Sequence, residues 1–142
     1  MRPSASDPSS EPVAHLVRSD ETYVGKQGLT YGVGVYAQNT GAERLCMHLL
    51  RIPPGGRARA HVHANHESVI YLISGETTVL HGKGLRHRLE MRAGDFLYIP
   101  ANVPHLPINP SETEVAVAVL ARTDPNEQES VVLLPDLDGV DA

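Results

Sequence analysis

Short runs of apolar residues, separated by glycine, proline, asparagine and aspartate, dominate the sequence from residue 13 onward. The runs are rich in Val, Ile, Leu, Tyr and Thr, a composition that favours β-strands. No run shows a sustained apolar period near 3.6 residues, so no long amphipathic helix is predicted. Many short strands at close spacing favour an all-β sandwich or barrel. The predicted strands are residues 13–18, 29–36, 44–52, 68–74, 77–81, 87–91, 95–99, 114–121 and 130–134.

The 142 residues suit one domain that is large enough to bury a core. Residues 1–12 are rich in Ser, Pro and Asp, and we expect them to form a mobile N-terminal tail. Residues 13–122 are assigned to the barrel, and residues 123–142 to a C-terminal loop, a last strand and an acidic tail. That strand is expected to pair with an edge of its own barrel or of a partner chain.

Charge and composition exclude several classes of partner. The net charge is −5 and no block of Lys and Arg occurs, so neither nucleic acid nor an anionic membrane surface is expected to bind. No apolar run resembles a signal peptide or is long enough to span a bilayer. Cys46 is the single cysteine, which excludes an internal disulfide and suits a cytoplasmic protein.

A histidine pair supplies the first candidate for chemistry. His61 and His63 are two residues apart, so on a strand both rings point to the same face. Neutral imidazole is the commonest metal ligand, but a pair needs at least one further ligand. His105 is the best distant candidate, because it follows a tight turn in which Asn102 tolerates a left-handed backbone and Pro104 restricts the chain.

These residues stand in two motifs that resemble those of the cupin superfamily. The first motif is met by Gly55, His61, His63, Glu67 and, one place late, Gly75. The second is met by Gly94, Pro100, His105 and Asn109, with Asn102 where the family has glycine. The resemblance implies a double-stranded β-helix, the cupin jelly-roll barrel. It also implies one divalent transition metal ion inside the barrel, held by His61, His63, Glu67 and His105. Imidazole ligands accept Zn, Fe, Ni, Mn or Cu, so the ligands do not identify the ion.

The position of Glu67 is ambiguous. Counting back from Gly75, the glutamate position of the family falls on Ser68, and a slip of one residue in a strand reverses the face of a side chain. The following "VIYLI" is apolar on both faces, so the pattern does not settle the register. A bulge near Asn65 or Ser68 would turn Glu67 inward, which is the alternative we favour. Otherwise His66 replaces or joins it, or neither residue reaches the metal.

Four further residues are candidates for the pocket. His48 is in phase with the apolar residues around it, so it is either a proton-transfer group or a hydrogen-bonded core histidine. Arg59 shares the parity of His61 and is a candidate for binding an anionic substrate at the pocket mouth. Tyr71 and Tyr98 either present hydroxyls to the substrate or pack. His81 and His87 flank a hairpin turn and are expected to be solvated.

The closer resemblance is to small bacterial cupins, including cupin-type aromatic polyketide cyclases. It implies Lewis-acid chemistry of the cyclase, isomerase or lyase kind on a small carbonyl-rich or aromatic substrate. Two alternatives stay open, namely a dioxygenase that uses iron, nickel or copper, and a non-catalytic protein that binds a small molecule. The resemblance and the apolar last strand also suggest a homodimer.

Overall fold

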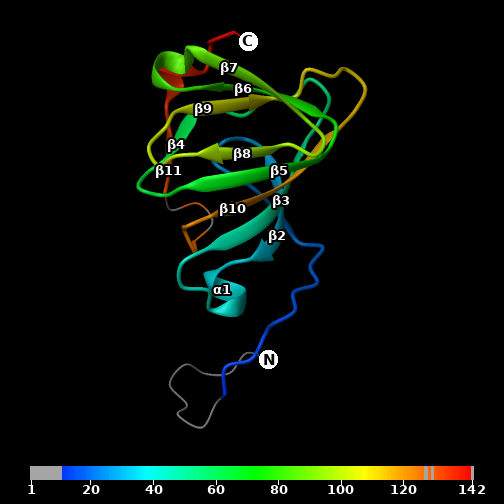
Figure 1. The fold of residues 1–142 in the computed structure, drawn as a ribbon, viewed down its shortest axis with the longest axis vertical. Coiled ribbons are helices and arrows are strands. Elements are labelled where there is room, and N and C mark those ends of the chain that lie inside the picture. The colour runs from blue at the N-terminus through cyan, green and yellow to red at the C-terminus, as the bar shows by residue number, and fades with distance from the viewer. Residues whose placement is uncertain (1–10, 127, 129, 142) are drawn as a thin grey trace.

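Two antiparallel β-sheets face each other in the computed structural model, which describes residues 11–126, 128 and 130–141 (Figure 1). The six-stranded sheet has the order β1 (Thr22–Val24), β2 (Thr30–Val35), β3 (Cys46–Ile52), β10 (Ala116–Arg122), β5 (Ser68–Ser74), β8 (Phe96–Ile99). The five-stranded sheet has the order β11 (Val131–Leu133), β4 (His61–His63), β9 (His105–Ile108), β6 (Glu76–His81), β7 (His87–Arg92). The short helical segments are α1 (Ala37–Thr40), η1 (Lys83–Leu85) and η2 (Pro135–Leu137).

This arrangement confirms the expected all-β double-stranded β-helix, but one predicted strand is wrong. Residues 13–18 form no strand, and Val13 and Leu16 are exposed. The first strand is instead β1, which pairs with β2. An apolar run becomes a strand only where a sheet edge accepts its backbone, and the sequence pattern does not show that edge. The predicted tail lies, up to residue 10, outside the described residues.

The last strand pairs with its own barrel, one of the two alternatives that the sequence left open. β11 lies antiparallel to β4, with Val131 opposite His63 and Leu133 opposite His61. The segment after β11 covers the outer face of the five-stranded sheet, where it forms a small second core. Asp138 accepts a hydrogen bond from the Ala60 backbone at 2.7 Å. The C-terminal segment therefore holds the strand that carries the histidine pair.

The main core lies between the two sheets. It contains buried side chains from both sheets, among them Leu50, Leu72, Val79 and Leu120. In β10 every second residue, beginning with Ala116, is buried, which is the alternation of a strand with one face toward the core. Fully burying a large aliphatic side chain stabilises the fold by roughly 1.5–3 kcal/mol. The inner faces of both sheets therefore form one packed interior, within which the histidines lie.

Two residues of the second motif fix the backbone near the histidines. Asn102 has a φ of 65°, so asparagine occupies the left-handed position where the family has glycine. Asn109 is 1% exposed and donates hydrogen bonds to the carbonyl oxygens of Ile52 and Glu114. Both motif residues therefore act on the backbone, at the two ends of the segment that contains His105. Among the described residues no helix is long and apolar enough to cross a membrane.

Candidate metal centre

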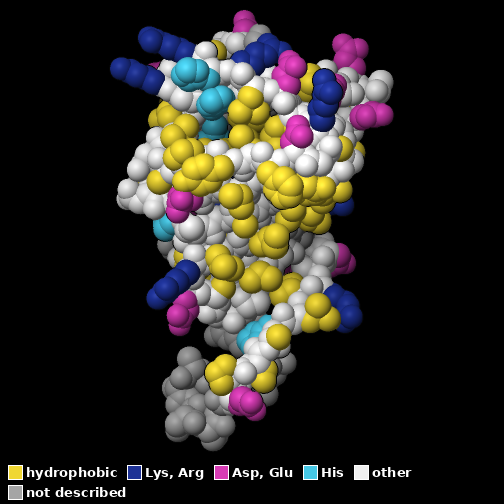
Figure 2. All heavy atoms as spheres, in the orientation of Figure 1, with side chains coloured by type: hydrophobic (Ala, Val, Ile, Leu, Met, Phe, Trp, Pro, Cys, Tyr) yellow, Lys and Arg dark blue, Asp and Glu magenta, His cyan; other side chains and the backbone are white. Residues whose placement is uncertain are grey.

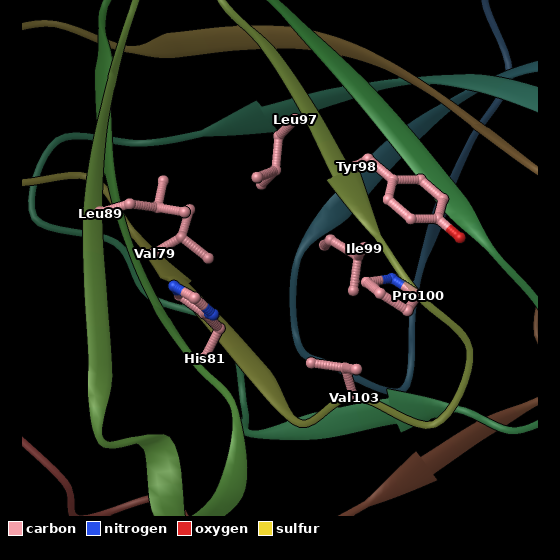
Figure 3. Close-up of a pocket in the computed structure, with 8 residues that line it drawn as sticks. All are labelled: Val79, His81, Leu89, Leu97, Tyr98, Ile99, Pro100 and Val103. Carbon is pink, nitrogen blue, oxygen red and sulfur yellow. The ribbon is translucent and has the colours of Figure 1, made fainter.

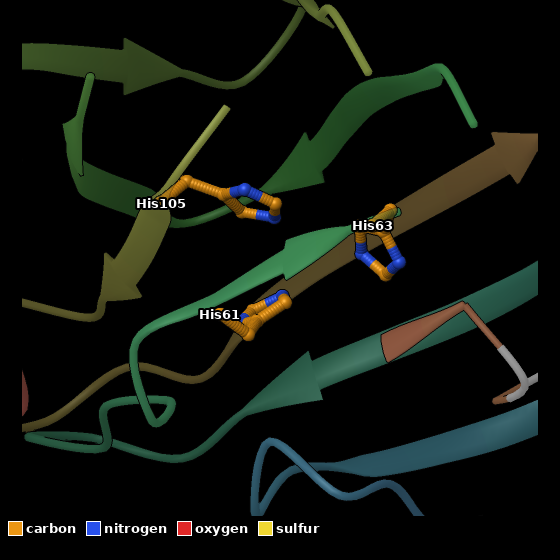
Figure 4. A group of neighbouring side chains, drawn as sticks. All are labelled: His61, His63 and His105. Atoms are coloured by element: carbon orange, nitrogen blue, oxygen red, sulfur yellow. The ribbon is translucent and has the colours of Figure 1, made fainter. Parts of the chain in front are cut away.

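Three histidines converge inside the barrel. His61 and His105 are direct partners on the antiparallel strands β4 and β9, and His63 lies two residues further along β4. All three are at least 96% buried, and their rings point into a common space (Figure 4). The ring centroids are 4.2 Å apart for His61 and His105, 5.1 Å for His61 and His63, and 5.3 Å for His63 and His105. Each offers a ring nitrogen within 4.8 Å of the nitrogens of the other two.

Backbone carbonyl groups orient two of these rings. The Nδ1 atom of His61 lies 2.7 Å from the carbonyl oxygen of Arg59, and that of His105 lies 3.0 Å from the carbonyl oxygen of Val103. A carbonyl oxygen only accepts, so both Nδ1 atoms carry the proton and donate. The lone pair of each ring is therefore on Nε2. The Nδ1 atom of His63 is buried and has no hydrogen-bond partner.

The three rings are neutral at physiological pH. Burial, the largest cause, lowers the pKa of His105 to about 4 and holds the pKa values of His61 and His63 far below their usual range. The positive charge of Arg122 and the mutual repulsion of the imidazolium forms lower them further. Neutral imidazole is the form that binds a metal ion, so the barrel holds the ligands in their competent state.

Glu67 does not join this group, contrary to the alternative that we favoured. Its side chain is exposed, and its Oε1 atom accepts a hydrogen bond of 2.6 Å from the hydroxyl of Tyr98. The strand has no bulge at this point, because β5 and β8 pair in unbroken register. Ser68 is therefore the inward residue, at 4% exposure, as the count from Gly75 indicated.

His66 also lies outside the group. It is partly buried, and its Nδ1 atom lies 3.4 Å from the hydroxyl oxygen of Thr123. Among the described residues, the candidate ligands that come together are therefore the three histidines without a carboxylate. This corresponds to the third alternative that the sequence allowed.

The structure separates the other candidates from the histidines. His48 is 1% exposed, and its Nδ1 accepts a 2.9 Å hydrogen bond from the Gly34 backbone, which makes it a hydrogen-bonded core residue.

Tyr71 lies on the outer face of the six-stranded sheet, where its ring contacts Phe96 at a centroid distance of 4.7 Å. Arg59 has an exposed side chain, and its contribution to the site is the carbonyl group that orients His61. Tyr71 therefore packs, one of its two alternatives, while the role of Arg59 in substrate binding stays a prediction.

A pocket of about 80 Å³ opens between the edges of the two sheets (Figure 3). His81, Val79 and Leu89 face β8 across it. Tyr98 is at its rim, but the hydroxyl points away from the other lining residues. The full lining is Val79, His81, Leu89, Leu97, Tyr98, Ile99, Pro100 and Val103.

His81 connects this pocket to the metal centre. It is the direct cross-strand partner of His105, so both side chains lie on the inner face of the five-stranded sheet. Burial, and then the neighbouring His87, lower the pKa of His81. Because it precedes a turn, His81 is expected from the sequence to be solvated, but its side chain is partly buried. Its spacing from Val79 could have indicated this position, because residues two apart on a strand point to the same face, and Val79 points to the core.

Arg122 is a second residue near the histidines that the sequence pattern did not single out. It ends β10, is 5% exposed, and lowers the pKa of the Tyr31 hydroxyl against the larger, opposite effect of burial. Its charge lowers the pKa values of His48 and of all three clustered histidines. Alternation again indicates its position, because Arg122 is two residues after Leu120 and every second residue of β10 points to the core.

The residues fit a divalent transition metal ion. Three imidazole nitrogens from two adjacent strands suit zinc and the other ions that bind imidazole. The fixed protons on two Nδ1 atoms leave the Nε2 lone pairs available. With these three imidazoles and, among the described residues, no carboxylate, a bound ion would keep coordination positions open for water or substrate and would keep its double charge.

Comparisons with known proteins agree with this geometry. The family model described as Cupin domain matches residues 48–121, more than half of the chain. A comparison with functionally curated proteins finds no significant match.

Solved structures show the same fold. Oxalate decarboxylase from Bacillus subtilis is similar with a TM-score of 0.71 and 23% identity over 88% of this chain, which spans 33% of that protein. An uncharacterized conserved protein with a double-stranded β-helix domain from Klebsiella pneumoniae has a TM-score of 0.60 and 18% identity, and the match covers 83% of this chain and 89% of the other. A putative sugar phosphate isomerase from Acidithiobacillus ferrooxidans has a TM-score of 0.59 and 22% identity, with 75% and 67% covered.

At these identities the solved structures establish the fold alone, and this chain spans only a third of the decarboxylase. The family is established by the domain match together with the two sheets and the inward histidines from both motifs. The chain belongs to the cupin family.

Proposed function

We propose that the protein is a metal-dependent enzyme that acts as a Lewis acid on a small carbonyl-bearing substrate, with chemistry of the isomerase, cyclase or lyase kind. The observation that carries the proposal is the group of three buried, neutral imidazoles with no carboxylate among them. We place the activity in the cytoplasm, which the single cysteine of the chain supports.

The ligand set favours this chemistry. When bound, a divalent ion with neutral ligands would polarise a carbonyl oxygen and stabilise the negative charge of an enolate. His61, His63 and His105 hold that position in a water-poor interior, where electrostatic stabilisation is stronger than in solvent.

His81 is the residue that we propose for proton transfer. It lines the pocket beside His105, so a ring nitrogen of His81 is available to a substrate that enters there. The same role for His48 is disfavoured, because its Nδ1 atom is occupied by the Gly34 amide and the residue is 1% exposed.

Exchange of carbon-bound protons in D₂O tests the proposal. Zinc-loaded protein is incubated without oxygen with a panel of 2-oxo acids, 1,3-diketones and aryl ketones, and proton NMR follows the signals next to each carbonyl group. We expect enzyme-dependent exchange for at least one class, its loss in His63→Ala and its retention in His15→Ala, whose imidazole is exposed. Turnover that requires oxygen would support a dioxygenase, and ligand binding without exchange or turnover would support a binding protein.

We also propose that the chain forms a homodimer through the outer face of the six-stranded sheet. Exposed apolar side chains gather there, over β8, β5 and β10 (Figures 1 and 2). Phe96 is 83% exposed, and Val69 and Ile73 are about half exposed. An apolar face of this kind is more typical of an interface than of a monomer surface.

Replacing Phe96 tests the dimer. Light scattering after size exclusion is expected to give twice the 15.4 kDa mass of the chain for the wild type and the single mass for Phe96→Glu. Leu16→Glu is the matched control, because Leu16 is 75% exposed and lies outside the sheets. A monomeric wild type, or a Phe96→Glu variant that stays dimeric, would contradict this interface.

A further inference from the structure

The guanidinium group of Arg122 is buried, and none of the described residues forms an ion pair with it. Among the described residues its Nε and Nη1 atoms find no hydrogen-bond partner, and its charge lowers the pKa of the neighbouring Tyr31 hydroxyl against the larger, opposite effect of burial. Within the part of the chain that the structure describes, no carboxylate oxygen lies within 4.0 Å of it. Arginine does not lose its proton in proteins, so this charge stays in the interior.

Such an arrangement is costly unless a partner is supplied. A buried charge without a partner destabilises a fold by several kcal/mol, which is why buried arginines are normally paired. Asp124 is also buried, but it is not an ion-pair partner of Arg122, and its Oδ1 atom accepts a hydrogen bond from the Asn126 backbone. Among the described residues, this buried cation therefore has no ion-pair partner at its place in the core.

That place is opposite the histidines. Arg122 is the direct partner of Ser68 on β5, and both side chains are on the inner face of the six-stranded sheet. The histidines lie on the facing five-stranded sheet, and the charge of Arg122 reaches all three of them. The hydroxyl of Ser68 is buried and has no partner either, so two adjacent side chains offer unused donors to the same interior.

The charge balance of the site indicates the missing partner. The imidazoles are neutral, Ser68 occupies the position where a carboxylate would have balanced the site, and Glu67 points to solvent. Guanidinium and hydroxyl donors together suit a carboxylate, whose oxygens accept several hydrogen bonds. An anion would satisfy the orphaned donors and neutralise the buried charge.

We propose that Arg122 and Ser68 form an anion-binding position inside the barrel, and that the substrate is a small carboxylic acid whose carboxylate binds there while its carbonyl group faces the three histidines. The second half of the proposal rests on the proposed function. The first half concerns only this chain's own residues, so the two are tested separately.

The first experiment uses metal-free protein. Malonate is the probe, and malonamide, which has the same shape without charge, is the matched ligand. We expect malonate at millimolar concentration to raise the melting temperature of the wild type by several degrees, because a ligand of the native state stabilises it. Malonamide is expected to have no effect, and Arg122→Met is expected to lose the response to malonate. Arg51→Met, which removes an exposed arginine from the neighbouring strand, should keep it.

The second readout separates a binding role from a structural one. Without ligand, Arg122→Met should melt no lower than the wild type, because the substitution removes an unpaired buried charge. A fall of several degrees in Arg122→Met that Arg122→Lys restores, together with an equal malonate response in all variants, would show that the guanidinium is structural and would overturn the proposal.

The third experiment adds zinc. Calorimetric titration of zinc-loaded protein should give a malonate affinity at least tenfold weaker in Arg122→Met, while both proteins hold the same amount of zinc. Equal malonate affinities in the two proteins would contradict the proposed anion-binding position, even if both proteins bind zinc. A wild type that binds no zinc but responds to malonate would refute the proposed function and keep the anion position.

Discussion

Replacing His105 by alanine is expected to reduce bound zinc from about one ion per chain to less than about a tenth. His105 is the candidate ligand from β9, whereas the other two come from β4, so its loss would leave a pair on one strand. Two imidazoles on one strand bind a divalent ion weakly, because the third protein ligand is missing. The measurement is elemental analysis of purified protein after dialysis against dilute zinc.

Glu67→Gln is the matched control for this experiment. The family pattern implies that Glu67 is a ligand, but its carboxylate is exposed and accepts a hydrogen bond from Tyr98. Zinc content should therefore be unchanged in Glu67→Gln. If that variant loses the ion, or if His105→Ala keeps it, the arrangement of ligands described above is wrong.

The metal-free protein is expected to lose stability steeply as the pH falls below about 6.5, the pKa of histidine in an unfolded chain. The buried histidines are neutral when folded, and burial lowers the pKa values of His48 and His105 to about 4. Between these two pKa values, the histidines bind protons in the unfolded chain but not in the folded chain. The stabilisation is fully present above the unfolded pKa and is lost as the pH falls toward the folded values.

Chemical unfolding at pH 7 and pH 5 measures this loss. One histidine with a folded pKa near 4 accounts for about 2 kcal/mol of unfolding free energy between these two values. His48→Leu removes one such group away from the metal centre, so the variant should lose less stability on acidification than the wild type. An unfolding free energy that is the same at both pH values would contradict the neutral, buried state of these histidines.

The sequence was sufficient for the fold class and for the three histidines that come together as candidate ligands. Alternation of apolar residues in β3 and β10 predicts strands because each has one face in the core. His61 and His63 share a face by the geometry of any strand, and the second motif brings His105 beside them. These inferences depend on local geometry and on a two-motif pattern, both of which the sequence carries.

The register at Glu67 needed the structure. β5 is apolar on both faces, and its outward residues Val69 and Ile73 remain exposed. A strand of this kind gives no sign of which residues face inward, so the glutamate was assigned to the wrong side. The same ambiguity left open whether Tyr71 and Tyr98 face the cavity, and the structure places Tyr71 against Phe96 and Tyr98 at the rim of the pocket.

The positions of Arg122 and His81 also needed the structure, for a different reason. Each is a polar residue at the end of a strand, where exposure is the ordinary outcome. Arg122 is buried and His81 is partly buried because of the strands that lie beside them, namely β5 for Arg122 and β9 for His81. Pairing between distant strands is a property of the topology, and no local pattern in a single sequence records it.

The most direct test of the metal centre is an anomalous-difference map from a crystal grown with zinc. We expect one peak roughly 2.0–2.1 Å from a ring nitrogen of each of His61, His63 and His105, with Glu67 directed to solvent. A map without a peak among these rings, or a peak that the Glu67 carboxylate coordinates, would contradict the three-histidine centre.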